Sequence, residues 1–252
     1  MIQHETLAQC HAWFDRFTGQ HASDDPLVAA NLQGKMDHTR CVARNARALA
    51  EALGRGEEGC AFAEILGLFH DVGRFPQLET HATFRDGSSF DHAAMSVQVL
   101  EAEGVPRFFR EREWAILSTA IRNHNKFAIP EECAGEALFY SRLIRDADKL
   151  DALKKAASGH LFTLLNLDGS DAVSPAVREA ILAGHCARYA EINTQPDIIL
   201  AIVAFVYDFN FPPTFAIVRE ERYLGRIFER LPQSEEFAVM REAAQGFLDG
   251  QG

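Results

Sequence analysis

The sequence lacks the cysteine pattern of a disulfide-rich or zinc-ribbon protein. It contains five cysteines, an odd number, and no two of them are spaced as Cys-x-x-Cys. Such a count fits reduced thiols better than a disulfide framework. A chain of 252 residues, of which 47% are hydrophobic, can also bury a core without covalent staples. The cysteine usage therefore favours a protein of a reducing compartment.

Positive charge is also scarce. The chain has 25 Lys and Arg residues against 36 Asp and Glu residues, which gives a formal net charge of −11. Binding to a nucleic-acid polymer needs clustered basic side chains. We therefore expect no nucleic-acid polymer as a partner, whereas a small anionic substrate held by a few arginines is compatible with this charge.

Long hydrophobic runs are missing as well. The most apolar segment, residues 198–207, lies between Asp197 and Asp208 and is far shorter than the roughly 20 residues that cross a bilayer. The first residues lack the cationic region and the apolar run of a signal peptide. We expect a cytoplasmic protein without membrane attachment, and the sequence leaves the oligomeric state open.

Strand-like alternation is absent at any useful length, and helical spacing takes its place. Four apolar residues at i, i+3, i+4 and i+7 form the clearest stripe: Phe62, Ile65, Leu66 and Phe69. Helices are predicted over 38–53, 88–104, 111–123, 137–157, 178–190, 196–208, 215–230 and 235–248, with a loop over 76–87. No Gly/Ser/Pro-rich linker divides the chain, so we predict one all-α domain over 1–252. Its core spans about 30–160, and a helical extension covers about 161–252.

Four of the ten histidines stand at the ends of predicted helices: His38, His70, His92 and His124. A single histidine in an apolar helix is usually a hydrogen-bonded core residue, and we read the other six in that way. Helix ends that face one cleft can bring ligands together. His70 is followed directly by Asp71, a potential bridging ligand. Mixed imidazole and carboxylate ligands predict a site for Fe, Mn, Co, Ni or Zn.

The order of these residues resembles the signature of the HD superfamily of metal-dependent phosphohydrolases. Residues 68–74 read Leu-Phe-His-Asp-Val-Gly-Arg, similar to the apolar-HD-(I/V)-G-(K/R) core of that family. Residues 145–153 read Arg-Asp-Ala-Asp-Lys-Leu-Asp-Ala-Leu, which resembles its ADxxDAL helix. The resemblance covers about 30 to 160. It implies a helical HD-domain bundle, here with additional C-terminal helices.

Superfamily members with two metal ions carry further histidines after the His-Asp pair, and this chain has the same order. The resemblance thus implies two divalent ions joined by Asp71, with that residue taking part in catalysis. The implied ligands are His38, His70 and Asp148 on one ion, and His92 and His124 on the other. Two alternatives stay open at this point: a single ion with structural roles for the last two histidines, or no ion.

One ligand is ambiguous from the sequence. The apolar stripe of the predicted 137–157 helix brings Asp146 nearer to its buried flank. The family pattern points instead to Asp148. We expect Asp148 to be the ligand, with Asp146 as the alternative.

Basic residues near the motifs are the candidates for substrate binding. Arg74 occupies the position where many HD hydrolases carry a Lys or Arg near the scissile phosphate, so the resemblance implies a catalytic and phosphate-binding role. Arg122, Lys126 and Arg145 are further candidates for substrate binding, although helical Arg and Lys are mostly surface residues. The expected substrate is a nucleotide or another small phosphoester, hydrolysed by a metal-activated water.

Two other functions share parts of this pattern. Some proteins with the same six-ligand order are di-iron oxygenases, and a catalytically idle chain could be a nucleotide-binding module. The sequence contains no Gly-Tyr-Pro triplet, which disfavours the cyclic-dinucleotide phosphodiesterase branch. Hydrolysis of a phosphoester is the function that we expect.

Overall fold

The protein was analysed as a computed structural model that describes residues 4–160 and 171–251. Those residues form helices and connecting turns without any strand, which confirms the all-α prediction. Their contacts divide them into two compact units, the first covering 4–148 and the second covering 149–160 with 171–251. That the two units form one folding domain stays a prediction.

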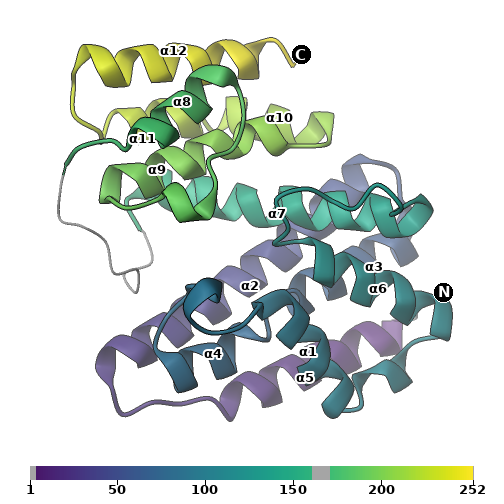
Figure 1. Ribbon diagram of the computed structural model, residues 1–252. Helices are drawn as coiled ribbons and strands as arrows, with labels where there is room; N and C mark the ends of the chain where they lie inside the picture. The colour runs from purple at the N-terminus through teal and green to yellow at the C-terminus, as the bar shows by residue number, and fades with distance from the viewer. Residues whose placement is uncertain (1–3, 161–170, 252) are drawn as a thin grey trace. The chain divides into compact units, whose positions relative to one another are not determined.

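The first unit contains the helices drawn from purple to teal in Figure 1. They are α1 (His4–Gly19), α2 (Pro26–Ala52), α3 (Gly56–Phe69), α4 (Arg74–His81), α5 (His92–Ala102) and α6 (Glu111–Asn123). Two short 3-10 helices, η1 (Asp86–Ser88) and η2 (Val105–Phe108), lie on either side of α5 in the chain. The long helix α7 (Gly135–Ser158) begins in this unit and continues into the second.

Helices α2 and α3 pack against each other and form the centre of the first unit. Helix α2 begins at an Asp25-Pro26 cap, where the Asp25 carboxylate accepts the backbone N–H groups of Leu27 and Val28 at 2.8 and 3.1 Å. The predicted apolar stripe of α3 is buried along its whole length. A Cβ atom at Gly67 would lie 2.4 Å from the Cα atom of Ala43, so only glycine permits this helix approach.

Helix α4 lies where the sequence predicted a loop. The predicted loop began at Pro76, but this proline is the third residue of α4. In the first turn of a helix a backbone N–H has no partner within the helix, so proline costs little there. Helix α1 was not predicted at all, and it buries Trp13 and Phe14 in the core.

The second unit contains α8 (Pro175–Ala183), η3 (Tyr189–Glu191), α9 (Gln195–Val203), η4 (Ala204–Asp208), α10 (Pro212–Glu220), α11 (Tyr223–Phe228) and α12 (Glu235–Asp249). The predicted 178–190 helix ends early because Gly184 adopts a positive φ of 77°. The predicted 215–230 helix is broken at Arg222, which has a φ of 53°. None of the described helices has an apolar stretch long enough to cross a bilayer.

Candidate metal centre

All six predicted ligands lie in the first unit, and five different elements supply them. His70 and Asp71 directly follow α3, His92 is the first residue of α5, and His124 directly follows α6. Asp148 lies within α7. His38 does not stand at a helix end as predicted, because the Asp25-Pro26 cap starts α2 well before it. The four histidines and Asp71 are buried, and Asp148 is partly exposed.

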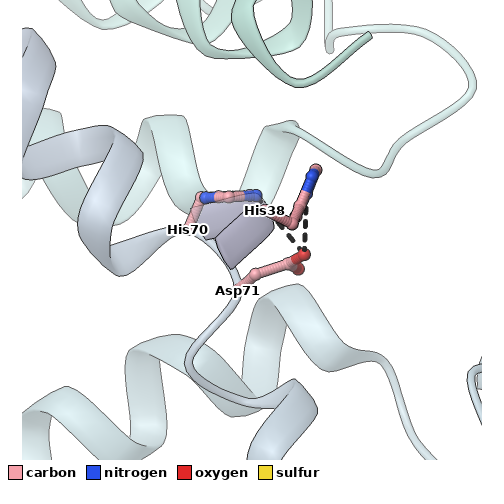
Figure 2. Close-up of side chains that lie close together, drawn as sticks. All are labelled: His38, His70 and Asp71. Atoms are coloured by element: carbon pink, nitrogen blue, oxygen red, sulfur yellow. Dashed lines mark ion pairs between the residues drawn. The ribbon is translucent and has the colours of Figure 1, made fainter. Parts of the chain in front are cut away.

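One oxygen of Asp71 faces the first group of predicted ligands. Its Oδ2 atom lies 3.8 Å from Nε2 of His38 and 3.3 Å from Nε2 of His70. Figure 2 shows both imidazole rings directed toward this carboxylate. The Oδ1 atom of Asp148 lies 3.0 Å from Nε2 of His38 and 3.8 Å from Nε2 of His70. These residues therefore surround one small volume beside Oδ2.

The other oxygen of Asp71 faces the second group. Its Oδ1 atom lies 3.3 Å from Nε2 of His92 and 3.4 Å from Nε2 of His124. The two Nε2 atoms are themselves 3.0 Å apart. Asp71 thus lies between two sets of donors and presents a different oxygen to each.

Three of the histidines use Nδ1 for a hydrogen bond directed away from Asp71. His70 donates to the carbonyl of Gly67 and His124 to the carbonyl of Ile121, both at 2.7 Å. His92 donates to Oδ2 of Asp86 at 2.6 Å. A neutral imidazole that donates from Nδ1 keeps a lone pair on Nε2, which is the atom that can bind a metal. These three rings are oriented as metal ligands.

The residues present fit a metal ion. Nε2 of His70 and Oδ1 of Asp71 are buried and have no hydrogen-bond partner. A buried polar atom without a partner is costly unless another ligand satisfies it. Groups able to hold an ion include His38, His70 and Asp71 on one side and Asp71, His92 and His124 on the other. A cation held by His38, His70 and Asp71 would satisfy Nε2 of His70, and a cation held by Asp71, His92 and His124 would satisfy Oδ1 of Asp71.

The pKa shifts of His92 and of the two carboxylates suit cation binding, whereas at His70 burial would lower the pKa and the charge of Asp71 outweighs it and raises the pKa. Burial and the nearby charge of Arg74 lower the pKa of His92 to about 4, so its ring is neutral at pH 7. Burial alone would raise the pKa of Asp71, but the charges of Lys35 and His70 hold it well below its usual value. Burial acts in the same direction on Asp148, and the hydrogen bond from His38 outweighs it and lowers the pKa. Both carboxylates are therefore ionised.

Lys35 belongs to the site although the sequence analysis did not single it out. Its side chain is buried, and its ammonium group forms an ion pair with Oδ2 of Asp71. Lys35 precedes His38 by three positions in α2, and residues at this spacing share a helix face. That spacing was the one signal that could have identified it.

Asp86 is a second residue that the sequence analysis missed. Besides His92, its carboxylate accepts hydrogen bonds from Arg74 at 2.9 Å, Gln77 at 3.1 Å and Asn125 at 3.3 Å. Burial would raise its pKa, but the hydrogen bond and charge of His92 lower it to about 2. Nothing in the local sequence distinguishes Asp86 from an ordinary loop aspartate.

The four basic residues predicted to bind substrate lie in different surroundings. Arg74 donates from Nη1 to Gln77, Asp86 and the carbonyl of Phe84, and its Nε atom lies 3.8 Å from Oδ1 of Asp71. Arg145 is buried and donates to backbone carbonyls of residues 123–127, including those of Asn123 at 3.2 Å and His124 at 3.4 Å. It therefore supports the turn that carries His124.

The other two basic residues are more exposed. Lys126 pairs with Asp91 at 2.5 Å, and Arg122 lies 4.0 Å from Glu101. Substrate binding by any of the four basic residues stays a prediction.

The choice between the two aspartates of α7 is clearer in the structure than in the sequence. Asp148 takes part in a group of possible metal ligands with His70 and His124, whereas Asp146 joins none of the groups found among residues 4–160 and 171–251. Asp146 is completely buried in the helix packing. The geometry favours Asp148 as the ligand.

Comparison with known proteins identifies a family for one segment of the chain. The searches of curated proteins and of solved structures gave no match. The family model described as "HD domain" matches residues 36–153, a segment that begins two residues before His38 and includes all six predicted ligands. Buried His and Asp groups able to hold a metal lie within the same segment. Residues 36–153 therefore match the HD domain family.

Proposed function

We propose that this protein hydrolyses a phosphoester bond in a nucleotide or another small phosphorylated metabolite, using two divalent transition-metal ions. At the coarser level, an HD domain indicates the superfamily of metal-dependent phosphohydrolases. The proposal goes further by specifying two ions, a substrate class and the residues that act.

One observation carries the two-ion proposal. The two carboxylate oxygens of Asp71 face different ligand groups, with Oδ2 near His70 and Oδ1 near His92 and His124, each at 3.3–3.4 Å from an Nε2 atom. A carboxylate that served a single ion would not need a second set of imidazole donors around its other oxygen. The division supports a bridging role for Asp71.

The ligand set determines the charge that a substrate would meet. Four histidines and two carboxylates surround the site, and neutral imidazoles cancel none of the charge of a cation. Divalent ions held there supply an activated water and stabilise the charge of a phosphate group. Arg74 adds a guanidinium near Asp71, although its Nη1 donors are already shared with Gln77 and Asp86. We infer that Arg74 acts mainly through its charge.

The test combines metal analysis with a screen of phosphomonoesters and phosphodiesters. Protein purified without chelator should contain about two equivalents of metal and hydrolyse at least one substrate class. His92→Ala should lose one equivalent and the activity, because it removes one of two imidazoles on the Oδ1 side. His185→Ala is the matched control, since His185 lies in the second unit and its side chain bonds only the carbonyl of Cys186 in the described contacts. The control should keep both ions and full activity.

Three results would contradict the proposal. Full metal content and full activity in His92→Ala would show that hydrolysis does not need a second ion held by His92. Turnover that consumes dioxygen and stops under anaerobic conditions would instead indicate the oxygenase alternative. Saturable nucleotide binding without turnover across the whole panel would indicate a binding module.

A further inference from the structure

The hydrogen-bond partners of the three Nδ1 atoms differ in kind. His70 and His124 each follow the last residue of a helix and donate to a carbonyl three positions earlier, in Gly67 and Ile121. Carbonyl groups in the last turn of a helix lack partners within the helix, so they are available as acceptors. The orientation of these two rings is therefore supplied by the backbone.

His92 stands in the opposite situation. It is the first residue of α5, and the first turn of a helix exposes N–H groups and not carbonyls. Its Nδ1–H group needs an acceptor from elsewhere in the fold, and Oδ2 of Asp86 supplies it at 2.6 Å. Among these three rings, His92 alone depends on a side chain for its orientation.

Asp86 is held in place from several directions. Arg74 and Gln77 donate to its Oδ1 atom, and Asn125 donates to its Oδ2 atom. Asn125 directly follows the ligand His124 and also donates to Asp91, the N-cap of α5, at 2.8 Å. One carboxylate thus connects α4, the start of α5 and the turn after α6, which are the elements around the Oδ1 side of Asp71.

We propose that Asp86 is a positioning residue for the second metal ion: its carboxylate holds His92 in the tautomer whose Nε2 lone pair faces Oδ1 of Asp71. This inference rests on the proposed two-ion site. Carboxylate partners of metal-binding histidines fix the tautomer and ring orientation, and their loss weakens metal binding by about 10- to 100-fold. The loss should be confined to the ion on the His92 side.

The test compares Asp86→Ala, Asp86→Asn and Asp86→Glu with wild type by metal titration. The Ala and Asn variants should bind the second equivalent about 10- to 100-fold more weakly and keep the first equivalent. Asp86→Glu retains a carboxylate and should recover part of the affinity. Asp15→Asn is the matched control, since Asp15 pairs only with the exposed side chain of Arg40 in the described contacts. It should bind both ions as wild type does.

A second readout does not depend on activity or on the number of ions. Nitrogen-15 NMR of the imidazole rings in chelated protein should show His92 protonated at Nδ1 in wild type, with this preference lost in Asp86→Ala and Asp86→Asn. A preserved Nδ1–H tautomer together with wild-type metal affinity would overturn the positioning role. A wild type that binds one ion only would refute the two-ion proposal, and the tautomer of His92 would then still decide the role of Asp86. Far-UV circular dichroism checks that each variant is folded.

Discussion

At the scale of single residues, Lys35 and a metal ion compete for the same atom. The ammonium group of Lys35 pairs with Oδ2 of Asp71, the oxygen that faces His38, His70 and Asp148. Burial lowers the pKa of Lys35 while the charge of Asp71 acts in the opposite direction. A cation that binds beside Oδ2 must share this oxygen with a buried positive charge.

Replacing Lys35 with methionine should therefore tighten binding of the first ion. Methionine preserves most of the side-chain volume and removes the charge. Repulsion between the Lys35 ammonium group and a cation beside Oδ2 costs a few kcal/mol, and loss of the ion pair with Asp71 offsets part of what its removal would gain. We therefore expect the affinity for the first ion to rise on the order of tenfold. Isothermal titration of chelated protein with Mn(II) measures the effect. Lys154→Met, in an exposed position of α7, is the control. Unchanged or weaker affinity in Lys35→Met would exclude competition.

The residue scale also shows which candidate residues the sequence can reveal. The His-Asp pair, His92 and His124 could be recognised because their types and order are local properties of the chain. Asp86 could not be, because its role depends on the closeness of α4, α5 and the 123–127 turn in space. Arg74 was recognised by position, but the sequence could not show that its Nη1 donors are shared with Gln77 and Asp86.

At the scale of elements, Gly73 controls how closely the His70-Asp71 turn approaches α5. A Cβ atom at this position would lie 2.4 Å from the carbonyl oxygen of His92 and 2.6 Å from the backbone N of Ser96. The N–H group of Gly73 also donates to the hydroxyl of Ser96 at 2.9 Å. Both obstructing atoms belong to the backbone, so they can yield only if α5 moves.

Gly73→Ala should consequently impair stability and metal binding together. Overpacking of this kind costs about 1–3 kcal/mol, and movement of α5 carries His92 away from Asp71. Urea unfolding and metal analysis of the same preparation measure the two effects. In Gly19→Ala, at the end of α1, nothing lies within 4 Å of the added atom, and that variant should retain both properties. Stability and metal content equal to wild type in Gly73→Ala would show that α5 tolerates the displacement.

In the second unit, Asp197 joins the starts of two helices. Its carboxylate accepts the backbone N–H groups of Ser174 at 2.8 Å, Asn193 at 2.9 Å and Thr194 at 3.0 Å. The Ser174 hydroxyl donates to it at 2.6 Å. Burial would raise the pKa of Asp197, and these hydrogen bonds outweigh burial and lower it. The residue therefore completes the capping box of α9 and holds Ser174, the N-cap residue of α8.

The stability contributed by Asp197 should depend on pH. Because its pKa is lower in the folded state, the contribution is fully present above the unfolded value of about 3.9 and is lost as the pH falls through the folded value. Asp197→Asn should cost about 1–3 kcal/mol at pH 7, since an amide group cannot accept all of these donors. The difference from wild type should shrink below about pH 4. Urea unfolding at pH 7 and pH 3 measures the free energy of unfolding of both proteins, with Asp249→Asn in α12 as the control. A difference between Asp197→Asn and wild type that is the same at both pH values would show that the ionisation of Asp197 does not contribute to stability.

Element boundaries were predictable only where a single local signal decides them. The predicted 88–104 helix ends at Gly104, a glycine with a positive φ of 69° that follows the last residue of α5 by two positions. Helix α4 was missed because the cost of Pro76 depends on its distance from the helix start, which the sequence pattern did not define. The break at Arg222 carries no glycine or proline, so its positive φ had no sequence signal.

At the scale of the whole molecule, metal ions should stabilise the two units unequally. All proposed ligands lie in residues 4–148, and none lies in the second unit. A ligand that binds only the folded state stabilises it by about 2.7 kcal/mol at a concentration 100 times its Kd. If the two units unfold independently, calorimetry with and without Mn(II) should show one transition that shifts to higher temperature and one that does not.

The same calorimetry tests the predicted single domain. Asp197→Asn should lower the temperature of the metal-insensitive transition only. That result would assign this transition to the second unit. If one cooperative transition shifted as a whole with metal and with Asp197→Asn, the two units would unfold together. That result would support a single domain over 1–252 and contradict independent units.

Gly67 and Gly73 lie on either side of the His70-Asp71 pair, and each is required by contact with a neighbouring backbone. Neither supplies a ligand. In evolutionary terms, two separate constraints therefore act on the segment. The glycines keep three helices at their present spacing, and the His-Asp pair supplies the side chains proposed to bind metal. A descendant that lost the histidine but kept both glycines would retain the scaffold without catalysis. A descendant that lost a glycine would lose the geometry first, even with every ligand in place.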